Sequence, residues 1–584
     1  MTSIFETAVE IWAPPGEVLG GLFAALRENA LDVRESGGLC LVIARDALEP
    51  GLTDVMERAR AGGRNWLLVA AIGDLASVGP IFGPLRSPCY RCLADRLLLN
   101  GVERAGPLFN AQRDAAFRLA AAEASAWTHT GRARTDKHWL SIGPNGDRQR
   151  HPVIPFCADC KAAAKRVRLT ASGLESGASG IVTGCTVEEI APGLFRASAG
   201  SSQVWIPDHA GRYLRESPQS VDGKGATAAA AIRSCLGEGA ERYSLFCQST
   251  ERRHLATYQA VAARAIHPDS LTLTSASQRS RATWWRRHHG SFHWPGESFK
   301  DSCETDWVES VDATSGETVL VPAEYCLIGF GGRFSQADSN GCAAGSTRWH
   351  AARSALLELI ERDSVAIWWY NRLKRPRVDW RAFGSNGGIA GISRWLHDQG
   401  RRCWMLDLTT DLNIPVYAAV SCDSDGAHIA LGSGASLTPE IAAWKALAEM
   451  TAHTRDFDLR PGTPPADGNL RAWWSWWHSA NLADHPYLIP SRKEPKPQKE
   501  ATGASPKSEL LACVREVERS GLRVLLYHHT RPELKIPVIR ALVPGLRHFW
   551  ARFAPGRLYS VPVKLGWRAK PIAETDLNPT PYFL

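Results

Sequence analysis

The N-terminal part of the chain carries two continuous apolar runs with a helical segment between them. Leu39–Ala44 and Trp66–Ile72 are short and apolar throughout, which is typical of strands buried on both faces. Asp54–Ala61 has the composition of a helix. Strand, helix and strand in this order predict a βαβ unit and a parallel α/β layer. No Gly-x-Gly-x-x-Gly follows the first run, so this layer has no evident cradle for a nucleotide phosphate.

Further along, the pattern changes to short strands and Ala-rich helical segments. Leu406–Leu408 and Ile414–Ser421 predict strands joined by a turn at Thr409–Asn413, and an acidic helix follows at Ile441–Glu449. Ser172–Gly184 is rich in Gly and Ser, which is typical of a linker. We therefore expect an N-terminal α/β domain at residues 1–175, a linker at 176–200 and a second domain at 201–584.

Composition places the chain among globular proteins. Its 584 residues, 44% apolar and 22% charged, suffice for two or three domains with full cores. No apolar run approaches the length that a bilayer requires, and no secretory signal pattern opens the chain, so we expect a cytoplasmic protein without membrane contact. The net charge of +8 is mild and spread out. It fits an anionic nucleotide or an acidic peptide and does not establish nucleic-acid binding.

Arg279–His293 mixes basic residues with tryptophans and histidines. Proteins that bind single-stranded nucleic acid use such mixtures, but they repeat an aromatic stacking platform that this segment lacks. We therefore predict no nucleic-acid partner and an exposed loop near the nucleotide or peptide. Arg492–Ser508, rich in Lys and Pro, predicts a flexible surface insertion.

Two Cys-x-x-Cys pairs are the strongest local signal in the N-terminal part. Cys89, Cys92, Cys157 and Cys160 supply four thiolates, which match a closed tetrahedral zinc site of the structural kind. Fourteen cysteines in a chain of this size do not indicate a disulfide framework. A redox dithiol is the alternative, but such motifs come singly.

A nine-residue pattern occurs twice, 120 positions apart. Ser234-Cys-Leu-Gly-Glu238-Gly-Ala-Glu241-Arg242 recurs as Ser354-Ala-Leu-Leu-Glu358-Leu-Ile-Glu361-Arg362. On a helix, the Ser and both Glu of each copy share one face. Carboxylates one turn apart repel each other, so a pair of such motifs favours cations between them, and Mg²⁺ on carboxylates usually brings phosphates. A single copy is more often a solvated helix face.

Glycine-rich segments precede both copies. Gly223-Lys224-Gly225 comes before the first, and Asp338-Ser-Asn340-Gly341-Cys-Ala-Ala-Gly345 comes before the second. We interpret both as turns that open a helix whose first amides can hold an anion. Neither is a Walker loop, because Gly-x-x-x-x-Gly-Lys-Ser/Thr is absent.

With these motifs the chain resembles the YcaO cyclodehydratases, which bind ATP through paired glutamates and modify peptide backbones. The stretches that carry the resemblance run in family order: GKGATAAAAIRSCLGEGAERYS, SNGCAAGSTRWHAARSALLELIERD, DLTTDLNIPV and APGRLYSVPVKLGW. The resemblance implies an α+β YcaO domain at 201–584 that binds ATP and Mg²⁺. GPLRSPCYRCLADRLLLNG also resembles the degenerate, zinc-bearing ubiquitin-activating-enzyme-like domain that precedes the YcaO domain in azoline-forming members.

The resemblance also implies roles for individual residues. Mg²⁺ ligands are expected at Glu238, Glu241, Glu358 and Glu361, and phosphate contacts at Lys224, Ser234 and Arg242. Asn340 and Glu449 complete the expected nucleotide site, with His453 where the family often has Gln or Arg. The chain ends Asn578-Pro579-Thr580-Pro581-Tyr582-Phe583-Leu584. Azoline-forming members end on alternating prolines that reach the active site, so a catalytic role is expected for Pro579, Pro581 and Leu584.

The implied activity is ATP-dependent cyclodehydration of Cys, Ser or Thr in a ribosomal precursor peptide. About 40 residues precede the first predicted strand, too few for the leader-binding module of longer members, so we expect a separate leader-peptide-binding protein. A flavin dehydrogenase and a second copy of the chain are further partners to consider. The alternatives are a YcaO enzyme that forms thioamides or amidines, and a non-catalytic scaffold that presents peptide. The cysteine pairs and the proline-rich tail disfavour the first, and the intact glutamates disfavour the second.

Overall fold

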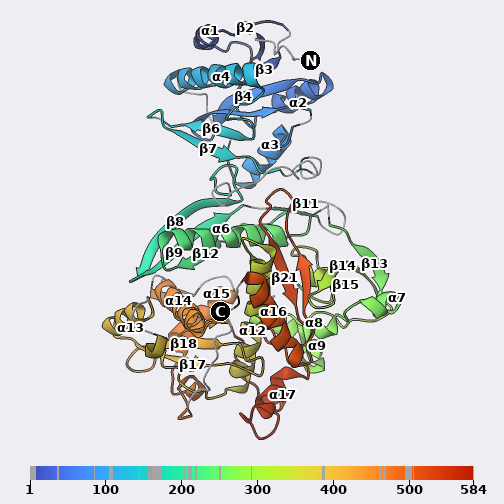
Figure 1. Cartoon of the computed structure of the whole chain (residues 1–584), viewed down its shortest axis with the longest axis vertical. Helices are drawn as coiled ribbons and strands as arrows, with labels where there is room; N and C mark the ends of the chain where they lie inside the picture. The colour runs from blue at the N-terminus through green and yellow to red at the C-terminus, as the bar shows by residue number, and fades with distance from the viewer. Residues whose placement is uncertain are drawn as a thin grey trace.

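The structure is a computed structural model (Figure 1), with a smaller N-terminal part joined to a larger C-terminal one. It describes residues 8–582 apart from the following gaps: 36–37, 85, 104–109, 144, 156, 158–159, 161–173, 203, 208–212, 217–219, 249–250, 291–292, 384–387, 459–462, 465–467, 494–502 and 504.

The N-terminal part is one mixed sheet of seven strands with helices on both faces. The strand order is β2-β1-β3-β4-β5-β6-β7, parallel from β2 to β4 and antiparallel from β4 to β7. Helices α1 and α4 pack on one face, and α2 and α3 pack on the other. The elements are β1 (Ala8–Trp12), α1 (Gly20–Glu28), β2 (Asp32–Val33), β3 (Leu39–Asp46), α2 (Gly51–Ala61), β4 (Asn65–Ile72), β5 (Leu75–Phe82), α3 (Tyr90–Leu99), α4 (Asn110–Thr130), β6 (His138–Ile142) and β7 (Arg148–Pro152).

The predicted βαβ unit is confirmed as β3-α2-β4, whose strands are parallel. The expectation that Leu39 opens the first strand is wrong, because Ala8–Trp12 already forms β1, parallel to β3. This strand is short, and Glu10 interrupts its apolar pattern, so local sequence signals it weakly. Its pairing with β3 supplies the stability that the five residues lack alone.

The range predicted as a linker contains regular structure. β8 (Val182–Ala191) and β9 (Leu194–Ser201) pair with each other, and β9 pairs with β12 (Ser220–Gly225). Just before β8, Ser179 is fully buried and accepts a hydrogen bond from the Trp139 indole at 2.9 Å. The described end of the Gly- and Ser-rich segment is therefore a packed turn and not a free hinge. The boundaries at 175 and 200 stay a prediction.

The C-terminal part combines antiparallel sheets with helices, in agreement with an α+β arrangement. One sheet has the order β13-β14-β20-β21-β16 with β15 beside β14, and a second has the order β17-β18-β19. The two predicted strands near residue 410 are confirmed as β17 and β18. The strands are β10 (Val204–Pro207), β11 (Tyr213–Glu216), β13 (His254–Thr257), β14 (Glu304–Asp312), β15 (Thr318–Pro322), β16 (Cys342–Ala344), β17 (Arg402–Asp407), β18 (Val416–Cys422), β19 (Ala430–Ala435), β20 (Leu525–His528) and β21 (Val538–Leu542).

Helices surround these sheets, as Figure 1 shows. They are α6 (Ala228–Leu245), α7 (Tyr258–Val261), α8 (Asp269–Thr272), α9 (Ala276–Ser280), α10 (Ala282–His289), α11 (Ala323–Cys326), α12 (Arg348–Asn371), α13 (Gly388–Asp398), α14 (Pro439–Asp458), α15 (Gly468–Ser479), α16 (Pro506–Arg519) and α17 (Arg557–Lys564). The exposed loop expected at Arg279–His293 is instead mostly helical, because Trp285 of α10 packs into the core. Most of the insertion predicted at Arg492–Ser508 lies outside the described residues.

Helix α12 is the central support of the C-terminal part. It packs against α16, α17, β16, β19 and β21, and its last turns bury Trp368, Trp369 and Tyr370. Asp363 on this helix is fully buried and accepts a hydrogen bond from the Arg557 guanidinium at 2.7 Å. Removing one partner of such a buried pair costs about 3–5 kcal/mol. The acidic face of α12 is therefore held in a fixed orientation.

Among the described residues, no helix combines the length and the apolar character needed to cross a bilayer.

Candidate functional site

Three strand–helix units converge in the C-terminal part, and all three follow one plan. In the first two, the side chains of Thr227 and Thr347 cap α6 and α12 by accepting hydrogen bonds from the amides of Ala230 and His350. In the third, the Thr438 carbonyl accepts the first intrahelical bond of α14. A threonine thus stands at the N-terminal boundary of each helix.

A glutamate follows each of these threonines at the eleventh position: Glu238, Glu358 and Glu449. Because the rise per residue is constant, the three carboxylates stand at the same height and phase on their helices. A second glutamate follows three positions later in the first two units, whereas Ala452 takes that place in the third. The third acidic helix is therefore a reduced copy of the two that the sequence repeat reveals.

Close packing of each strand on its helix fixes this alignment. A Cβ placed on Gly225 would meet the amide nitrogen of Ala231 at 2.5 Å, and one on Gly345 would meet that of Ala351 at the same distance. Gly223–Gly225 belongs to strand β12, and Thr227 already occupies a first-turn amide of α6. The interpretation of Gly223–Gly225 as a turn is therefore wrong, because its glycines are in a strand and let it approach the helix; that the first amides of α6 hold an anion stays a prediction.

In the first copy, Glu238 is held from two sides. Its Oε2 accepts the Asp222 amide at 2.9 Å, and its Oε1 accepts the Arg242 guanidinium at 3.0 Å. Among the described residues, none donates a hydrogen bond to Glu241. Ser234, one turn before Glu238, is exposed. Arg242, expected beside phosphate, pairs with a glutamate of its own motif in this ligand-free arrangement.

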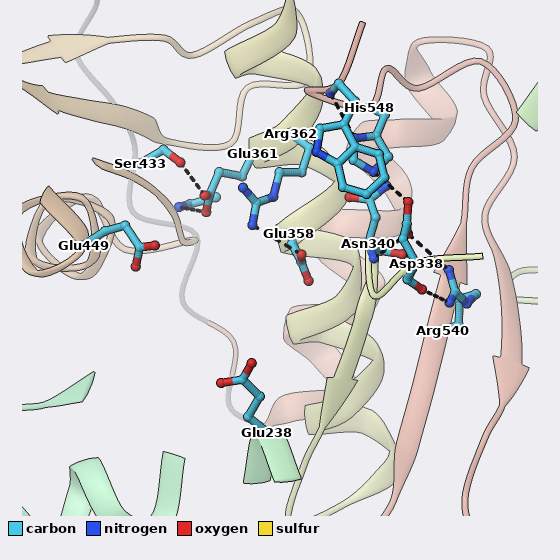
Figure 2. A network of polar contacts seen from close by, with 12 residues as sticks. Glu238, Asp338, Asn340, Glu358, Glu361, Arg362, Ser433, Glu449, Arg540 and His548 are labelled. Carbon is cyan, nitrogen blue, oxygen red and sulfur yellow. Dashed lines mark hydrogen bonds and ion pairs between the residues drawn. The ribbon is translucent and has the colours of Figure 1, made fainter. Parts of the chain in front are cut away.

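In the second copy, the neighbouring sheet positions one carboxylate. Glu361 accepts the hydroxyl of Ser433 at 2.6 Å and the amide of Ala435 at 3.0 Å, both from β19. Glu358 lies 3.5 Å from Arg362, whose guanidinium stacks on the Phe549 ring at 4.3 Å. Figure 2 shows the carboxylates of Glu358 and Glu361, both on α12, facing the region that Glu238 of α6 and Glu449 of α14 also border.

In the third copy, a lysine and a histidine lie beside the single glutamate. Lys224 Nζ donates to Glu449 Oε2 at 2.6 Å, and His453 Nε2 lies 3.4 Å from Oε1. Lys224 comes from β12, so this ion pair joins the first unit to the third. Lys445 of α14 donates to the Ala435 carbonyl at 3.2 Å. These contacts give the site a cationic side opposite the paired glutamates.

A loop ahead of β16 adds a polar wall (Figure 2). Asp338 accepts His548 Nε2 at 3.0 Å and the Asn340 amide at 2.7 Å, and Arg540 donates to the Asn340 carbonyl at 3.1 Å. The Asn340 side-chain oxygen is buried without a hydrogen-bond partner. A buried oxygen of this kind can accept a hydrogen bond from an outside donor or bind a cation.

The pKa values of the carboxylates differ between the paired glutamates and the third helix. Burial, together with the nearby Glu358 and Glu238, raises the pKa of Glu241 well above its ordinary value. Burial and the Glu361 and Asp338 charges raise the pKa of Glu358 to about 7. The pKa of Glu449 moves the other way, well below its ordinary value, because Lys224 and His453 outweigh its burial. Burial thus disfavours the charged forms of Glu241 and Glu358, whereas Lys224 and His453 favour the charged form of Glu449.

The C-terminal tail reaches this cluster. The Trp369 indole donates to the Thr580 carbonyl at 2.7 Å, and the Tyr582 ring is buried between Trp369 and Phe549, with centroids 5.1 and 5.5 Å away. The Tyr582 pKa is raised by burial first, then by the charges of Glu361 and Glu449, with a hydrogen bond to Ser433 opposing. Pro579 is exposed and Pro581 half-buried, whereas Leu584 lies outside the described residues.

The expected site residues are thus largely brought together. Figure 2 places Glu238, Glu358, Glu361, Glu449 and Asn340 around one region. Sequence reasoning singled out the segments that contain Asp338 and Tyr582 but gave neither residue a role of its own, and it missed Ser433, Lys445 and His548. One signal was present, because Gly432-Ser433-Gly434 precedes the third helix as Gly223-Lys224-Gly225 precedes the first.

The four cysteines of the N-terminal part form a second site. Their sulfurs all lie within 4.8 Å of one another, with Cys89–Cys92 and Cys92–Cys157 at 3.7 Å and Cys89–Cys157 at 3.8 Å. A tetrahedral Zn²⁺ with Zn–S bonds near 2.3 Å keeps its sulfurs about 3.8 Å apart. The geometry therefore fits the zinc site that the Cys-x-x-Cys pairs predict.

The cysteine site is linked to the glutamate helix α6. Arg96, one turn after Cys92 on α3, is fully buried; it donates to Ser202 at 2.9 Å and lies 5.5 Å from the centre of the Tyr243 ring. Tyr243 directly follows Arg242 and donates to Glu533 at 3.0 Å. The N-terminal part therefore supports the helix that carries Glu238 and Glu241.

Comparison with known proteins agrees with this arrangement. The profile described as "YcaO cyclodehydratase, ATP- and Mg2+-binding" matches residues 222–547. A solved structure described as a heterocyclase in complex with substrate and cofactor is 28% identical with a TM-score of 0.84, covering 99% of this chain and 85% of its own. The heterocyclase TruD is 27% identical with a TM-score of 0.74, at 99% and 84% coverage. An uncharacterized protein of Methanothermobacter thermautotrophicus is 28% identical over 56% of this chain and 81% of its own length.

The fold and the clustered glutamates define an enzyme that handles a nucleotide without a P-loop. The chain belongs to the YcaO cyclodehydratase family, whose profile covers more than half of it. It is accordingly an ATP-dependent peptide cyclodehydratase.

The cysteine cluster makes a first prediction. Cys157→Ser removes one of four thiolates, so the variant should lose zinc and solubility while the ATP turnover of the molecules that stay folded changes little. Elemental analysis, the yield of soluble protein and ATPase rates check this. Cys303→Ser, at a half-buried cysteine outside the cluster, should behave like wild type. Wild-type protein purified without stoichiometric zinc would contradict the assignment.

The raised pKa of Glu358 makes a second prediction, for protein with zinc but without Mg²⁺ and nucleotide. Because its pKa is about 7 in the folded state and about 4.3 in the unfolded chain, folding takes up a proton between these values. The free energy of unfolding should therefore increase as the pH falls from about 8 to 5.

Glu358→Gln should weaken this pH dependence and stabilise the protein at pH 8 by about 1–3 kcal/mol. Urea unfolding at several pH values measures both effects. Glu440→Gln, at an exposed position of α14, is the control. Equal pH slopes for Glu358→Gln and wild type would show that Glu358 does not titrate in this range.

Proposed function

We propose that the enzyme forms thiazolines and oxazolines in a ribosomally synthesised precursor peptide. The side chain of a Cys, Ser or Thr attacks the carbonyl carbon of the preceding residue. The resulting amide oxygen is phosphorylated by ATP, and phosphate then leaves with that oxygen while the ring nitrogen loses its proton. An amide oxygen is a poor leaving group, and its conversion into a phosphate ester gives a direct chemical reason to consume ATP.

Glu238, Glu241, Glu358 and Glu361 would hold Mg²⁺ at the nucleotide phosphates, where it neutralises charge. The observation that carries this assignment is geometric: Glu238, Glu358, Glu361 and Glu449 converge on one region beside the buried side-chain oxygen of Asn340 (Figure 2). Lys224, Ser234 and Arg242 would face phosphate, with Glu449 and Asn340 at the rest of the nucleotide. Positioning and charge neutralisation are the protein's share of catalysis.

Two rival activities are less well supported. An enzyme that makes thioamides or amidines would start from the same ATP activation, but the cysteine cluster and the docked proline-rich tail favour azoline formation. A non-catalytic scaffold has no need for glutamates that converge on one region from three helices (Figure 2). Loss of one water per ring, seen by mass spectrometry of a co-expressed precursor peptide, tests the proposal.

The proposed partners are the precursor peptide and a separate leader-peptide-binding protein. Residues 8–33 form β1, α1 and β2, which are built into the N-terminal sheet and its helical layer. Because these residues pack in the sheet, they do not form a separate leader-binding module, and this supports a leader-binding role for another protein. Two further proposed partners are a flavin dehydrogenase that oxidises the rings and a second copy of the chain.

Glu361 tests the Mg²⁺ assignment. Glu361→Gln keeps the shape of the side chain but removes its charge, so ATP turnover should fall by at least about 100-fold while the thermal midpoint stays within a few degrees. Glu440→Gln should retain full turnover. ATP turnover of Glu361→Gln close to wild type would mean that the repeated motif serves only as a helix face.

The tail tests the catalytic proposal. Deleting Tyr582–Leu584 removes the ring between Trp369 and Phe549, and azoline formation should fall by orders of magnitude, because a lost transition-state contact costs about 3 kcal/mol or more. Nucleotide affinity should change far less, since α6, α12 and α14 stay in place. Rates by mass spectrometry and affinities by calorimetry separate the two. Tyr582→Phe, which keeps the ring, is the matched control for packing, and cyclisation at the full rate after deletion would exclude the tail from catalysis.

A further inference from the structure

An open cavity of about 880 Å³ lies beside β17, away from the glutamate cluster. Its volume falls in the range of ligand-binding pockets. Arg377, Trp380, His397, Arg402, Trp404 and Ile489 are among the residues that line it. None of its lining residues belongs to the glutamate site, so the proposed chemistry does not account for it.

The cavity stands at an open sheet edge. β17 is the terminal strand of the β17-β18-β19 sheet, and only a short segment borders it: the Val378 amide donates to the Met405 carbonyl and the Asp407 amide to the Pro376 carbonyl, both at 2.9 Å. By the two-residue alternation of a strand, Cys403 is the next residue whose backbone groups point to this edge. Cys403 and Trp404 project from opposite faces, yet both line the cavity. The cavity therefore continues the strand edge where the bordering segment ends.

Two arginines of the lining stand outside the ion pairs found among the described residues. Arg377 and Arg402 are exposed, and within the described part of the chain no carboxylate lies within 4 Å of either guanidinium. Arg401, by contrast, pairs with Asp423 at 2.8 Å. Asp379 is the acidic residue in the lining. Trp380 and Trp404 also line the cavity; both are largely buried, and the Arg402 guanidinium lies 5.8 Å from the centre of the Trp404 ring.

We propose that this cavity binds an extended, acidic segment of the peptide substrate, which adds to the edge of β17. Main-chain hydrogen bonds to Cys403 supply the docking, as in other strand additions. Carboxylates pair with Arg377 and Arg402, and apolar side chains pack on the two tryptophans. The source of the segment rests on the proposed function; the acidic, extended chemistry rests on the cavity itself.

The cavity and the glutamate site lie at opposite edges of the same sheet. The opposite edge of the same sheet is β19, whose Ser433 and Ala435 hold Glu361. Three strands at about 4.8 Å spacing separate the edges by about 10 Å. A segment bound at β17 is thus anchored to the sheet that positions a catalytic carboxylate, while the residues to be cyclised extend beyond it.

Fluorescence anisotropy with a labelled Glu-Phe-Glu-Phe-Glu peptide tests the proposal on the full chain. Wild type should bind it saturably, and Arg377→Glu combined with Arg402→Glu should weaken binding by at least about tenfold. Arg394→Glu, an exposed arginine of α13 outside the cavity, should bind like wild type, and a Lys-Phe-Lys-Phe-Lys peptide should not bind. No saturation by wild type below about 1 mM, or equal affinity of the double variant, would overturn the proposal.

A labelled ADP serves as the competing probe. Wild type is expected to bind ADP at the glutamate cluster. If wild type binds a second ADP, and the double variant loses this second site while its affinity for the peptide is unchanged, the cavity is an anion site for nucleotides and the peptide assignment is wrong. The ATP turnover and thermal midpoint of the double variant should equal those of wild type, because neither arginine belongs to the glutamate cluster. If wild type binds the acidic peptide but forms no rings in its precursor, the proposed function is wrong and the cavity proposal stands. If wild type forms rings but the double variant binds the acidic peptide as tightly as wild type does, the cavity proposal is wrong and the proposed function stands.

Discussion

The mutual repulsion of carboxylates held at one level by three helices is the constraint on which the C-terminal part depends. Glu241 and Glu358 lie near each other with raised pKa values, a state that only rigid surroundings can maintain. That rigidity comes from close strand–helix packing at glycine and from the buried Asp363–Arg557 pair that fixes α12. A cation bound between these carboxylates would favour their charged forms, so its binding would release protons.

Charge compensation is divided unequally among the three units. Arginine from the same motif accompanies Glu238 and Glu358, whereas Lys224 from another unit accompanies Glu449. The first and third units are therefore joined by an ion pair, while the first and second face each other across like charges. The buried Arg96 extends this support to the N-terminal part by packing on Tyr243, so the cysteine cluster and the glutamates belong to one connected structure.

Much of this site was predictable, because its signals are local. Two copies of a nine-residue motif and two Cys-x-x-Cys pairs can be recognised without knowledge of the fold. The third unit was recognised only through the family, because Lys445 and Ala452 replace the Ser and the second Glu, leaving Thr438 and Glu449 as its periodic markers. Contacts between distant segments were not predictable: the placement of Tyr582 beside the glutamates depends on how the tail packs against α12, and short strands such as β1 gain their stability from neighbours.

Each helix has its glutamate eleven positions after a threonine at its N-terminal end. The number of residues between the two therefore cannot vary. Inserting one residue between Thr227 and Glu238 would rotate that carboxylate by about 100° and raise it by about 1.5 Å, out of reach of its partners on the other two helices. Substitutions on the outer faces of α6, α12 and α14 leave this phase intact. These helices should therefore tolerate substitutions on their outer surfaces. A single insertion or deletion should instead displace a carboxylate and disrupt the site, even though the helix itself still forms.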